Sequence, residues 1–385
     1  MKHPSAAKEG CFRNAVLRSG TELLRPLFHQ THETGVAYIC LCLPACTPVA
    51  SQKGIVSEVD LLRFIGISMF FLAHIGPPAA LFQLRSFDVP LMIFVSGLSY
   101  SGRQVVGYAS FVRKRLGRLL IPLYLFLTVY FLVMWLLSEC GVVEWFAARK
   151  VVGTYLLRLK PSINYVWIFR VFLIVMLLTP PLLRLERAVR DDRGFIALLG
   201  ALFGLQALLT GWLKPLHLGF LVDDWLLYAV GYSIPFLAGV RMRYADRRRS
   251  LWFCGIFLTA MVCAAAVMAD STGTWLRMQP YKYPPRVYFL LWGTTVSLLL
   301  WSLRKYWSPL LACRPALFIG RNTIWLYLWH IPFARLIKTS MTDVWWGFRF
   351  LLIYAIALTL CLIQSRIVGM CEKRYGSKFL KYLKD

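Results

Sequence analysis

The sequence predicts an all-α membrane protein, a polytopic helical bundle of about ten transmembrane helices with both termini in the cytoplasm. Of the 385 residues, 58% are hydrophobic and only 16% are charged, whereas about a quarter of the residues of a soluble domain are charged. Apolar runs recur from Val59 almost to the C-terminus. Since a run of about 20 residues can span a bilayer as a helix, little of the chain is left for a soluble domain.

Ten apolar segments are candidate transmembrane helices. Several are short or contain Pro and Gly, which membrane helices tolerate where neighbouring helices satisfy the freed backbone groups. The ten segments cover residues 59–77, 88–102, 119–138, 164–181, 195–212, 224–240, 251–269, 286–302, 315–334 and 345–366. An even number of spans leaves both ends of the chain on one side of the membrane.

The connections alternate between strongly and weakly basic. The more basic set holds 23 Lys and Arg residues against 11 in the other set, and comprises residues 103–118, 184–193, 241–249, 304–314 and the tail from 366. Because cytoplasmic loops carry the excess of positive charge, we expect this set inside the cell, in a multi-pass protein of the inner (plasma) membrane. The net charge of +26 would suggest nucleic-acid binding in a soluble chain. Here the basic clusters lie between apolar runs, so we expect the lipid bilayer, and no nucleic acid, as a partner.

The first 55 residues differ from the rest. Their one apolar run, Ala37 to Ala50, is interrupted by Pro44 and Pro48 and is too short to span a bilayer. We expect residues 1–55 to be a poorly ordered N-terminal extension and residues 56–385 to form the integral-membrane domain. The chain has 10 cysteines but no CxxC pair, so we expect no metal site and no required disulfide.

Two polar residues, Arg63 and His74, lie in the first predicted span. Polar residues inside a membrane are costly and usually functional. The two are 11 positions apart, so both lie on one helix face, about 16 Å apart along the axis. Taken singly, Arg63 resembles a snorkelling side chain at a helix end and His74 a packing histidine. Their shared face favours a pore or an active site.

Arg115 and Arg118 precede the third predicted span. They are three residues apart and therefore neighbours on one helix face. Paired guanidinium groups suit phosphate, because their donors are planar and fork-shaped. The simpler interpretation is a cytoplasmic anchor of the kind that the positive-inside rule describes.

Four motifs, taken in order, resemble the acyltransferase-3 membrane family. They are Arg63 and His74 separated by ten residues, the segment from Phe87 to Gly97, Arg115-x-x-Arg118 before Pro122, and the segment from Gly320 to Pro332. Many members of that family carry Val-Asp where this chain has Val89-Pro90. In this segment the chain looks more like the branch of the family that acts on capsular and other surface polysaccharides. It also lacks the carboxylate expected at position 90.

The resemblance implies transfer of an acyl group, usually acetyl, from cytoplasmic acyl-CoA to a sugar hydroxyl of an envelope polysaccharide or a lipid-linked oligosaccharide. His74 and Arg63 would be its catalytic residues. Arg115 and Arg118 would bind acetyl-CoA, a co-substrate, and no cofactor would be permanently bound. The chemistry agrees: a neutral imidazole can take the proton of a poorly nucleophilic sugar hydroxyl as the C–O bond forms. CoA is polyanionic, and the arginine pair is on the side of the membrane where CoA is found.

Two further residues, Asp88 and His330, are candidates for the acceptor site. Asp88 enters the second span from the outer side and could orient His74, as carboxylates do for catalytic histidines, or could simply cap its helix. His330 lies at the predicted depth of His74 and could line the acceptor site or pack as an ordinary histidine. Asp223 and Asp224 are expected to lie in solvent rather than to grip sugar hydroxyls.

The main alternative is a transporter, such as an exporter of lipid-linked sugars, in which Arg63, His74 and His330 would line a substrate path. A non-catalytic membrane scaffold fits the composition but not the shared face of Arg63 and His74. The sequence contains no P-loop, GxGxxG, HExxH or GxSxG motif. We therefore predict an integral-membrane O-acyltransferase.

Overall fold

A computed structural model describes residues 49–100, 107–272, 277–376, 380, 382 and 383. Every regular element in these ranges is helical, which confirms the all-α fold class. The elements are α4 (Val49–His74), α5 (Ala79–Leu84), η1 (Arg85–Phe87), α6 (Asp88–Tyr100), α7 (Tyr108–Glu139), α8 (Ala148–Tyr155), α9 (Trp167–Ala188), α10 (Asp192–Trp212), η2 (Lys214–Leu216), η3 (Val222–Leu226), α11 (Leu227–Met242), α12 (Arg247–Thr272), η4 (Gln279–Tyr281), α13 (Val287–Ser302), η5 (Arg304–Ala312), α14 (Arg314–Arg321), α15 (Thr323–Ser340) and α16 (Trp346–Tyr375).

In the described residues, each of the ten segments predicted to span the membrane contains a helix or helices over most of its length. In the described ranges, six are long and apolar enough to do so: Ala79–Tyr100, Tyr108–Glu139, Trp167–Ala188, Asp192–Leu216, Arg247–Asp270 and Trp346–Tyr375. α13 and η5, bent by 65° at their junction, would add a seventh if they form one span. The protein is thus a multi-pass membrane protein. The count of ten and the orientation remain predictions, because α11 and α13, with 16 residues each, are shorter than the about 20 residues that cross a bilayer.

The first helix of the described residues begins earlier than the first predicted span. α4 runs from Val49 to His74, whereas the first predicted span begins at residue 59. Residues 1–48, most of the predicted N-terminal extension, lie outside the described residues, so the order and the boundary of that extension are untested.

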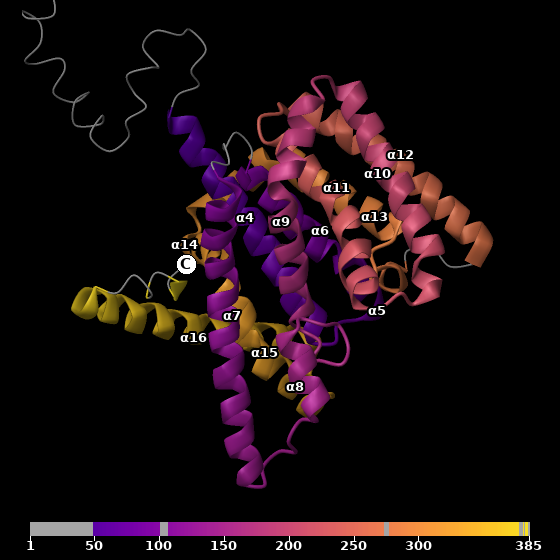
Figure 1. Ribbon diagram of the computed structural model, residues 1–385. Coiled ribbons are helices and arrows are strands. Elements are labelled where there is room, and N and C mark those ends of the chain that lie inside the picture. Colours follow the sequence, from indigo (N-terminus) through magenta and orange to yellow (C-terminus); the bar gives the residue numbers. More distant parts are fainter. Residues whose placement is uncertain (1–48, 101–106, 273–276, 377–379, 381, 384–385) are drawn as a thin grey trace, which may run out of the picture. The chain divides into compact units, whose positions relative to one another are not determined.

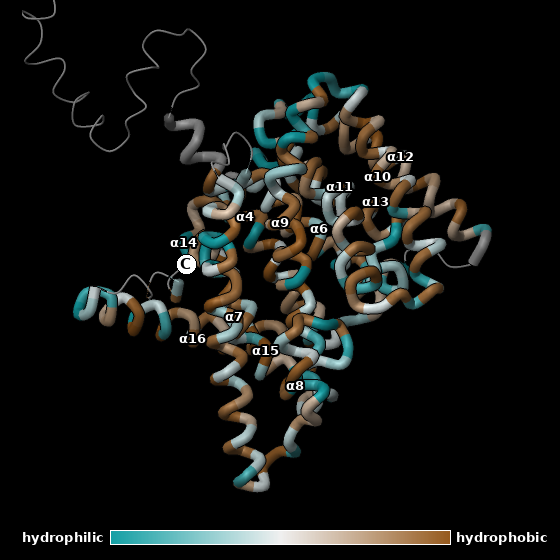
Figure 2. Tube along the Cα trace, in the orientation of Figure 1, coloured by the Kyte–Doolittle hydropathy of each residue, from teal (hydrophilic) through white to brown (hydrophobic). Residues whose placement is uncertain are grey.

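The axes of α4, α7 and α9 lie nearly parallel, with α9 antiparallel to α7, and α16 crosses them (Figure 1). Figure 2 shows these helices largely hydrophobic along their length, with hydrophilic residues gathered at the connections and helix ends. Only 28% of the most apolar stretch of α7 is buried inside the protein. The remaining apolar surface of α7 is therefore available to lipid.

A close backbone contact joins α6 and α11. A Cβ on Gly97 would lie 2.1 Å from the carbonyl oxygen of Phe236, and one on Gly239 would lie 2.0 Å from that of Phe94. Only glycine therefore allows this approach. Small residues at such contacts are typical of membrane helices, which associate through close packing and not through a hydrophobic driving force. The contact fixes α6, which also lines the candidate site.

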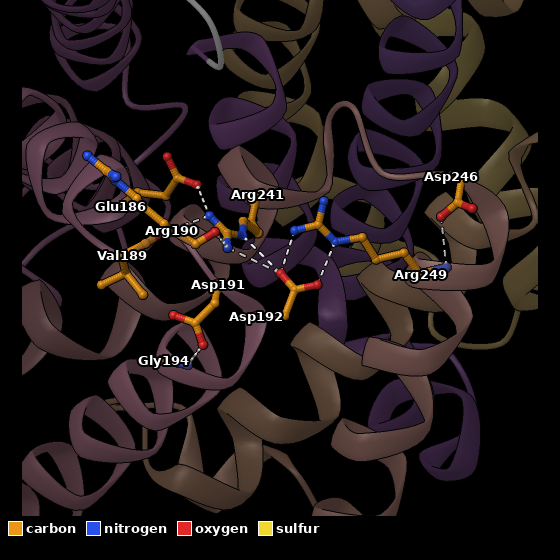
Figure 3. Close-up of polar contacts among 9 residues, drawn as sticks. All are labelled: Glu186, Val189, Arg190, Asp191, Asp192, Gly194, Arg241, Asp246 and Arg249. Carbon is orange, nitrogen blue, oxygen red and sulfur yellow. Dashed lines mark hydrogen bonds and ion pairs between the residues drawn. The ribbon is translucent and has the colours of Figure 1, made fainter.

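An ion-pair network joins the ends of four helices (Figure 3). Asp192 of α10 lies 3.2 Å from Arg241 of α11 and 2.8 Å from the Nε of Arg249 of α12. Arg241 also lies 3.1 Å from Glu186 of α9. Several charges in one network hold their geometry better than an isolated surface pair. The network therefore ties α9, α10, α11 and α12 together on the side of the two predicted cytoplasmic loops that it joins.

Asp88, at the start of α6, lies in a buried ionic cluster. Arg85 Nη1 donates to Asp88 Oδ2 at 2.5 Å, and Lys282 Nζ donates to Oδ1 at 3.0 Å. None of the three side chains is more than 3% exposed. Burial lowers the pKa of Lys282 to about 8, and the Asp88 carboxylate opposes that shift because it stabilises the charged ammonium group. Asp88 therefore compensates two buried cations.

Replacing Asp88 should destabilise the fold. We expect Asp88→Asn to lower the free energy of unfolding by roughly 3–5 kcal/mol, because the loss of one partner leaves buried charge uncompensated. Denaturant unfolding of the purified protein measures the effect, with Asp343→Asn at an exposed position as the matched control. Equal stability of the two variants would contradict the structural role of the cluster.

Candidate functional site

A cavity of about 740 Å³ lies among α4, α6, α7, α9, α14 and α15. Its volume is in the range of small-molecule sites. Its polar part carries one glutamate, Glu372, and five arginines: Arg63, Arg115, Arg118, Arg243 and Arg321. A cleft lined by an excess of one charge concentrates ligands of the opposite charge. This end of the cavity is therefore suited to a polyanion.

Asp60 holds two of these arginines in place. Arg63 Nη1 lies 2.8 Å from Asp60 Oδ1, and Arg321 Nε lies 2.9 Å from Oδ2. Arg63 also donates to the hydroxyl of Ser99 at 3.0 Å. Arg321 can reach Asp60 because Gly320 precedes it: a Cβ on Gly320 would lie 1.9 Å from the backbone carbonyl oxygen of Asp60. The glycine thus lets α14 pack directly on α4.

The other part of the cavity is apolar and aromatic. Met92, Phe70 and Tyr327 line it, and the last two rings meet edge to face with centroids 5.4 Å apart. Phe70 lies one turn before His74 on α4, and Tyr327 lies one turn before His330 on α15. The cavity therefore leads from the arginines toward two histidines.

His74 and His330 form a hydrogen-bonded pair. His74 Nδ1 lies 2.9 Å from His330 Nε2, and the ring centroids are 5.0 Å apart. His330 Nδ1 contacts the backbone carbonyl oxygen of Tyr327; since this oxygen can only accept, Nδ1 of His330 carries the hydrogen. In neutral His330 the Nε2 is then an acceptor, so His74 Nδ1 donates to it. Neutral His74 is left with a lone pair at Nε2, which is what a general base requires.

The two histidines differ in access. His330 is fully buried, with Phe71 stacked on it at 4.9 Å between centroids. His74 is partly exposed, and the ring of Tyr165 meets it edge-on at 4.7 Å. The hydroxyl of Tyr327 donates to the carbonyl oxygen of Tyr165 at 2.7 Å, which holds the segment that carries Tyr165. A substrate can therefore approach His74 but has no surface of His330 to contact.

The predicted site residues fall into two neighbouring groups. Arg63, Arg115 and Arg118 share the cavity. His74 is on the same helix as Arg63, but its hydrogen-bond partner is His330. Sequence reasoning placed these two histidines at one depth, and the structure brings them into contact. His330 is fully buried, and its predicted role in the acceptor site stays a prediction.

Two carboxylates have other partners than expected. Asp88 belongs to the buried ionic cluster described above, whereas His74 Nδ1 is bound to His330, so Asp88 is not the group that holds His74. Asp224, expected in solvent, lies 2.8 Å from the fully buried Arg170, and that expectation is wrong. A buried guanidinium needs a compensating charge, but the sequence does not show which carboxylate will supply it.

Three residues that shape the cavity were not predicted. Asp60 lies three residues before Arg63, a spacing that suits a helical ion pair, and Arg321 lies inside one of the recognised motifs; both carried a signal. Arg243 follows α11 and donates to the carbonyl oxygen of Leu98, a tertiary contact with no local signal. Within the described ranges, no group of three or more His, Cys, Asp or Glu side chains could hold a metal ion.

Comparison with known proteins points to one family. Residues 56–364 match the model of the acyltransferase-3 family, described as an acyltransferase domain. The matched region contains both histidines and every residue lining the cavity except Glu372 and Tyr382. No curated protein and no solved structure matches the chain.

Proposed function

We propose that this chain, which belongs to the acyltransferase-3 family and is a membrane acyltransferase, transfers an acetyl group in the inner (plasma) membrane. The donor would be cytoplasmic acetyl-CoA, and the acceptor a sugar hydroxyl of a surface polysaccharide or a lipid-linked oligosaccharide. The observation that carries the proposal is one cavity that combines five arginines with an apolar end beside a histidine pair.

Acyl-CoA suits the two parts of this cavity. Its phosphate groups would bind Arg115 and Arg118, because guanidinium forks match phosphate oxygens. Arg63, held by Asp60 and Ser99, would add a third cation whose geometry is fixed before the donor arrives. The pantetheine arm would lie along the apolar part, past Phe70, and carry the thioester toward the histidines.

His74 would act as the general base. Its Nε2 takes the proton of the acceptor hydroxyl while the hydroxyl oxygen attacks the thioester carbonyl carbon. The C–S bond then breaks, and the CoA sulfur receives the proton from His74 Nε2. The products are the sugar ester and CoA, and neutral His74 is restored. A positioned general base contributes typically about 10²–10⁴ in rate.

His330 would be a positioning residue for this base. Its Nε2 accepts the hydrogen of His74 Nδ1, which fixes the tautomer of His74 and stabilises the imidazolium that forms during transfer. A carboxylate has this role in serine-protease triads. A neutral histidine anchored on a backbone carbonyl performs it without placing another charge inside the membrane, where charges are costly.

Purified protein with labelled acetyl-CoA and candidate glycans tests the reaction. We expect label on the glycan only when acetyl-CoA and protein are both present. Movement of lipid-linked sugar across a vesicle membrane without acyl-CoA, and with no label transferred, would support the transporter instead. Mass spectrometry of the surface polysaccharide of host cells with and without the gene would identify the modified sugar.

We expect His74→Ala to lower kcat by at least about 10²-fold, the lower end for loss of a general base, with membrane insertion unchanged. His217→Asn, at an exposed residue with a left-handed backbone conformation (φ 49°) that Asn tolerates, is the matched control and should retain full activity. Retention of more than a tenth of wild-type turnover by His74→Ala would rule out this residue as the principal base.

Arg115→Gln and Arg118→Gln should each raise the KM for acetyl-CoA far more than the KM for the glycan, because both side chains line the donor cavity. Arg113→Gln removes an exposed arginine of the same helix that does not line the cavity, and should leave both constants near wild type. If all three variants change only expression or topology, Arg115 and Arg118 are membrane anchors and the donor binds elsewhere.

The positioning role of His330 predicts a difference between two variants. His330→Phe keeps a ring but no acceptor, and should lower kcat by about 10–100-fold with the KM for acetyl-CoA unchanged, since second partners of this kind are typically worth that much. His330→Gln offers its Oε1 to His74 Nδ1 and should recover part of the loss. Steady-state kinetics at matched thermal stability decides: equal losses for Phe and Gln would indicate a packing role only.

A further inference from the structure

The C-terminal half of α7, α8 and the loop from α8 to Tyr165 form a packed unit beside His74, on the side away from the arginines. α8 lies alongside the C-terminal half of α7 (Figure 1), with Thr128 and Tyr155 hydroxyls 3.1 Å apart. A Cβ on Gly153 of α8 would lie 1.7 Å from the carbonyl oxygen of Pro161. This contact locks α8 onto the loop that returns to His74. By the charge asymmetry of the loops, the unit faces the outside of the cell.

Aromatic rings line this unit. The ring of Tyr165, on the returning loop, meets His74 edge-on. Phe146 stacks on Tyr130 with centroids 6.4 Å apart, and Lys150 Nζ lies 4.7 Å from the centroid of the Phe146 ring. Tyr130 and Tyr165 are partly exposed. Rings combined with a few placed polar groups are typical of ligand sites.

Two cations, Lys150 and Arg335, come from helices that lie beside these rings: α8, which carries Lys150, and α15, which packs against α7. Burial, and after it the positive charge of Arg335 near the end of α15, lower the pKa of Lys150. Arg335 lies further along α15, whose Trp329 meets Phe126 of α7, one turn before Tyr130, edge to face with ring centroids 5.7 Å apart. Lys150 is partly buried and Arg335 is exposed. Within the described residues, neither forms an ion pair with a carboxylate.

We propose that the outer basic site, formed by Lys150, Arg335, Tyr130, Phe146 and Tyr165, binds an anionic group of the acceptor, either a sugar carboxylate or a phosphate of a lipid-linked saccharide. The inference rests on the proposed function, because it delivers the acceptor hydroxyl to His74. It adds that the acceptor is acidic.

An oxyanion between Lys150 and Arg335 would relieve the repulsion of two neighbouring cations. Charge-assisted hydrogen bonds to carboxylate or phosphate are roughly twice as strong as neutral ones, so this contact would dominate acceptor binding. Tyr165 touches His74, so a hydroxyl of the same or the adjoining sugar would reach His74 Nε2. A neutral sugar would leave both cations without a counter-charge, so the site would bind acidic acceptors in preference to neutral ones.

The test uses membranes that contain the full-length protein, acetyl-labelled acetyl-CoA, and a total glycan and lipid-linked saccharide extract of host cells lacking the gene. We expect the label on material that binds an anion-exchange column at neutral pH. Charge that survives mild acid, which cleaves the sugar–pyrophosphate–lipid linkage, lies on the sugar. Charge lost with the lipid comes from its phosphate. Either source agrees with the proposal.

Variants connect the product to the site. The double variant Lys150→Gln, Arg335→Gln should lower transfer at limiting acceptor at least about tenfold with the KM for acetyl-CoA unchanged. Arg149→Gln, with the same charge change at an exposed position of α8, should stay within about twofold of wild type. The exchanges Lys150→Arg and Arg335→Lys, which keep the charge, should retain most of the rate if the site acts through charge.

Three outcomes would overturn the proposal. Label confined to neutral glycan would show that the acceptor is not acidic. Equal rates for the double variant and Arg149→Gln would show that the site does not bind it. Absence of label from every fraction, even with the wild-type protein, would refute the proposed function itself, and the acidic acceptor with it.

Discussion

The backbone carbonyl of Tyr327 determines how the two histidines share their hydrogens. It can only accept, so His330 donates from Nδ1, His74 donates from Nδ1 to His330, and the lone pair of His74 is left at Nε2. Tyr327 and His330 lie one turn apart on α15, so a regular helix, and not a loop, sets this order. Tyr327 also binds the carbonyl oxygen of Tyr165 through its hydroxyl. One residue thus connects α15, α4 and the segment beside His74.

Charge compensation follows one pattern in three ionic clusters of the membrane domain. Buried cations need partners, because removing a charge from water is costly. Three aspartates meet this need, and each of them serves two basic side chains. Asp60 pairs with Arg63 and Arg321, Asp88 with Arg85 and Lys282, and Asp224 with Arg170 and Arg158. Each cluster therefore keeps a net positive charge. In the cavity, that surplus is what a polyanionic donor would neutralise.

Sequence patterns predicted what depends on local chain order and missed what depends on tertiary pairing. Apolar periods predicted where the helices lie, and motif spacing predicted that Arg63, Arg115 and Arg118 matter; the structure gathers these three in one cavity. The contact of His74 with His330, 256 positions apart, could be expected only as a shared depth. Asp88 has one local partner, Arg85, and one distant partner, Lys282, which was missed because it is 194 positions away. Helix packing decides such pairs, and single-sequence periodicity does not encode it.

In the proposed reaction, the arginine cavity and the histidine pair form one donor path. A structure of the full-length protein in a lipid nanodisc with a non-hydrolysable acetyl-CoA analogue would show where the donor lies. We expect the phosphates against Arg115 and Arg118, the pantetheine arm past Phe70, and the acyl carbonyl carbon near enough to His74 for a hydroxyl to lie between them. An analogue bound outside the cavity, or one whose acyl end stays among the arginines, would refute a single donor path.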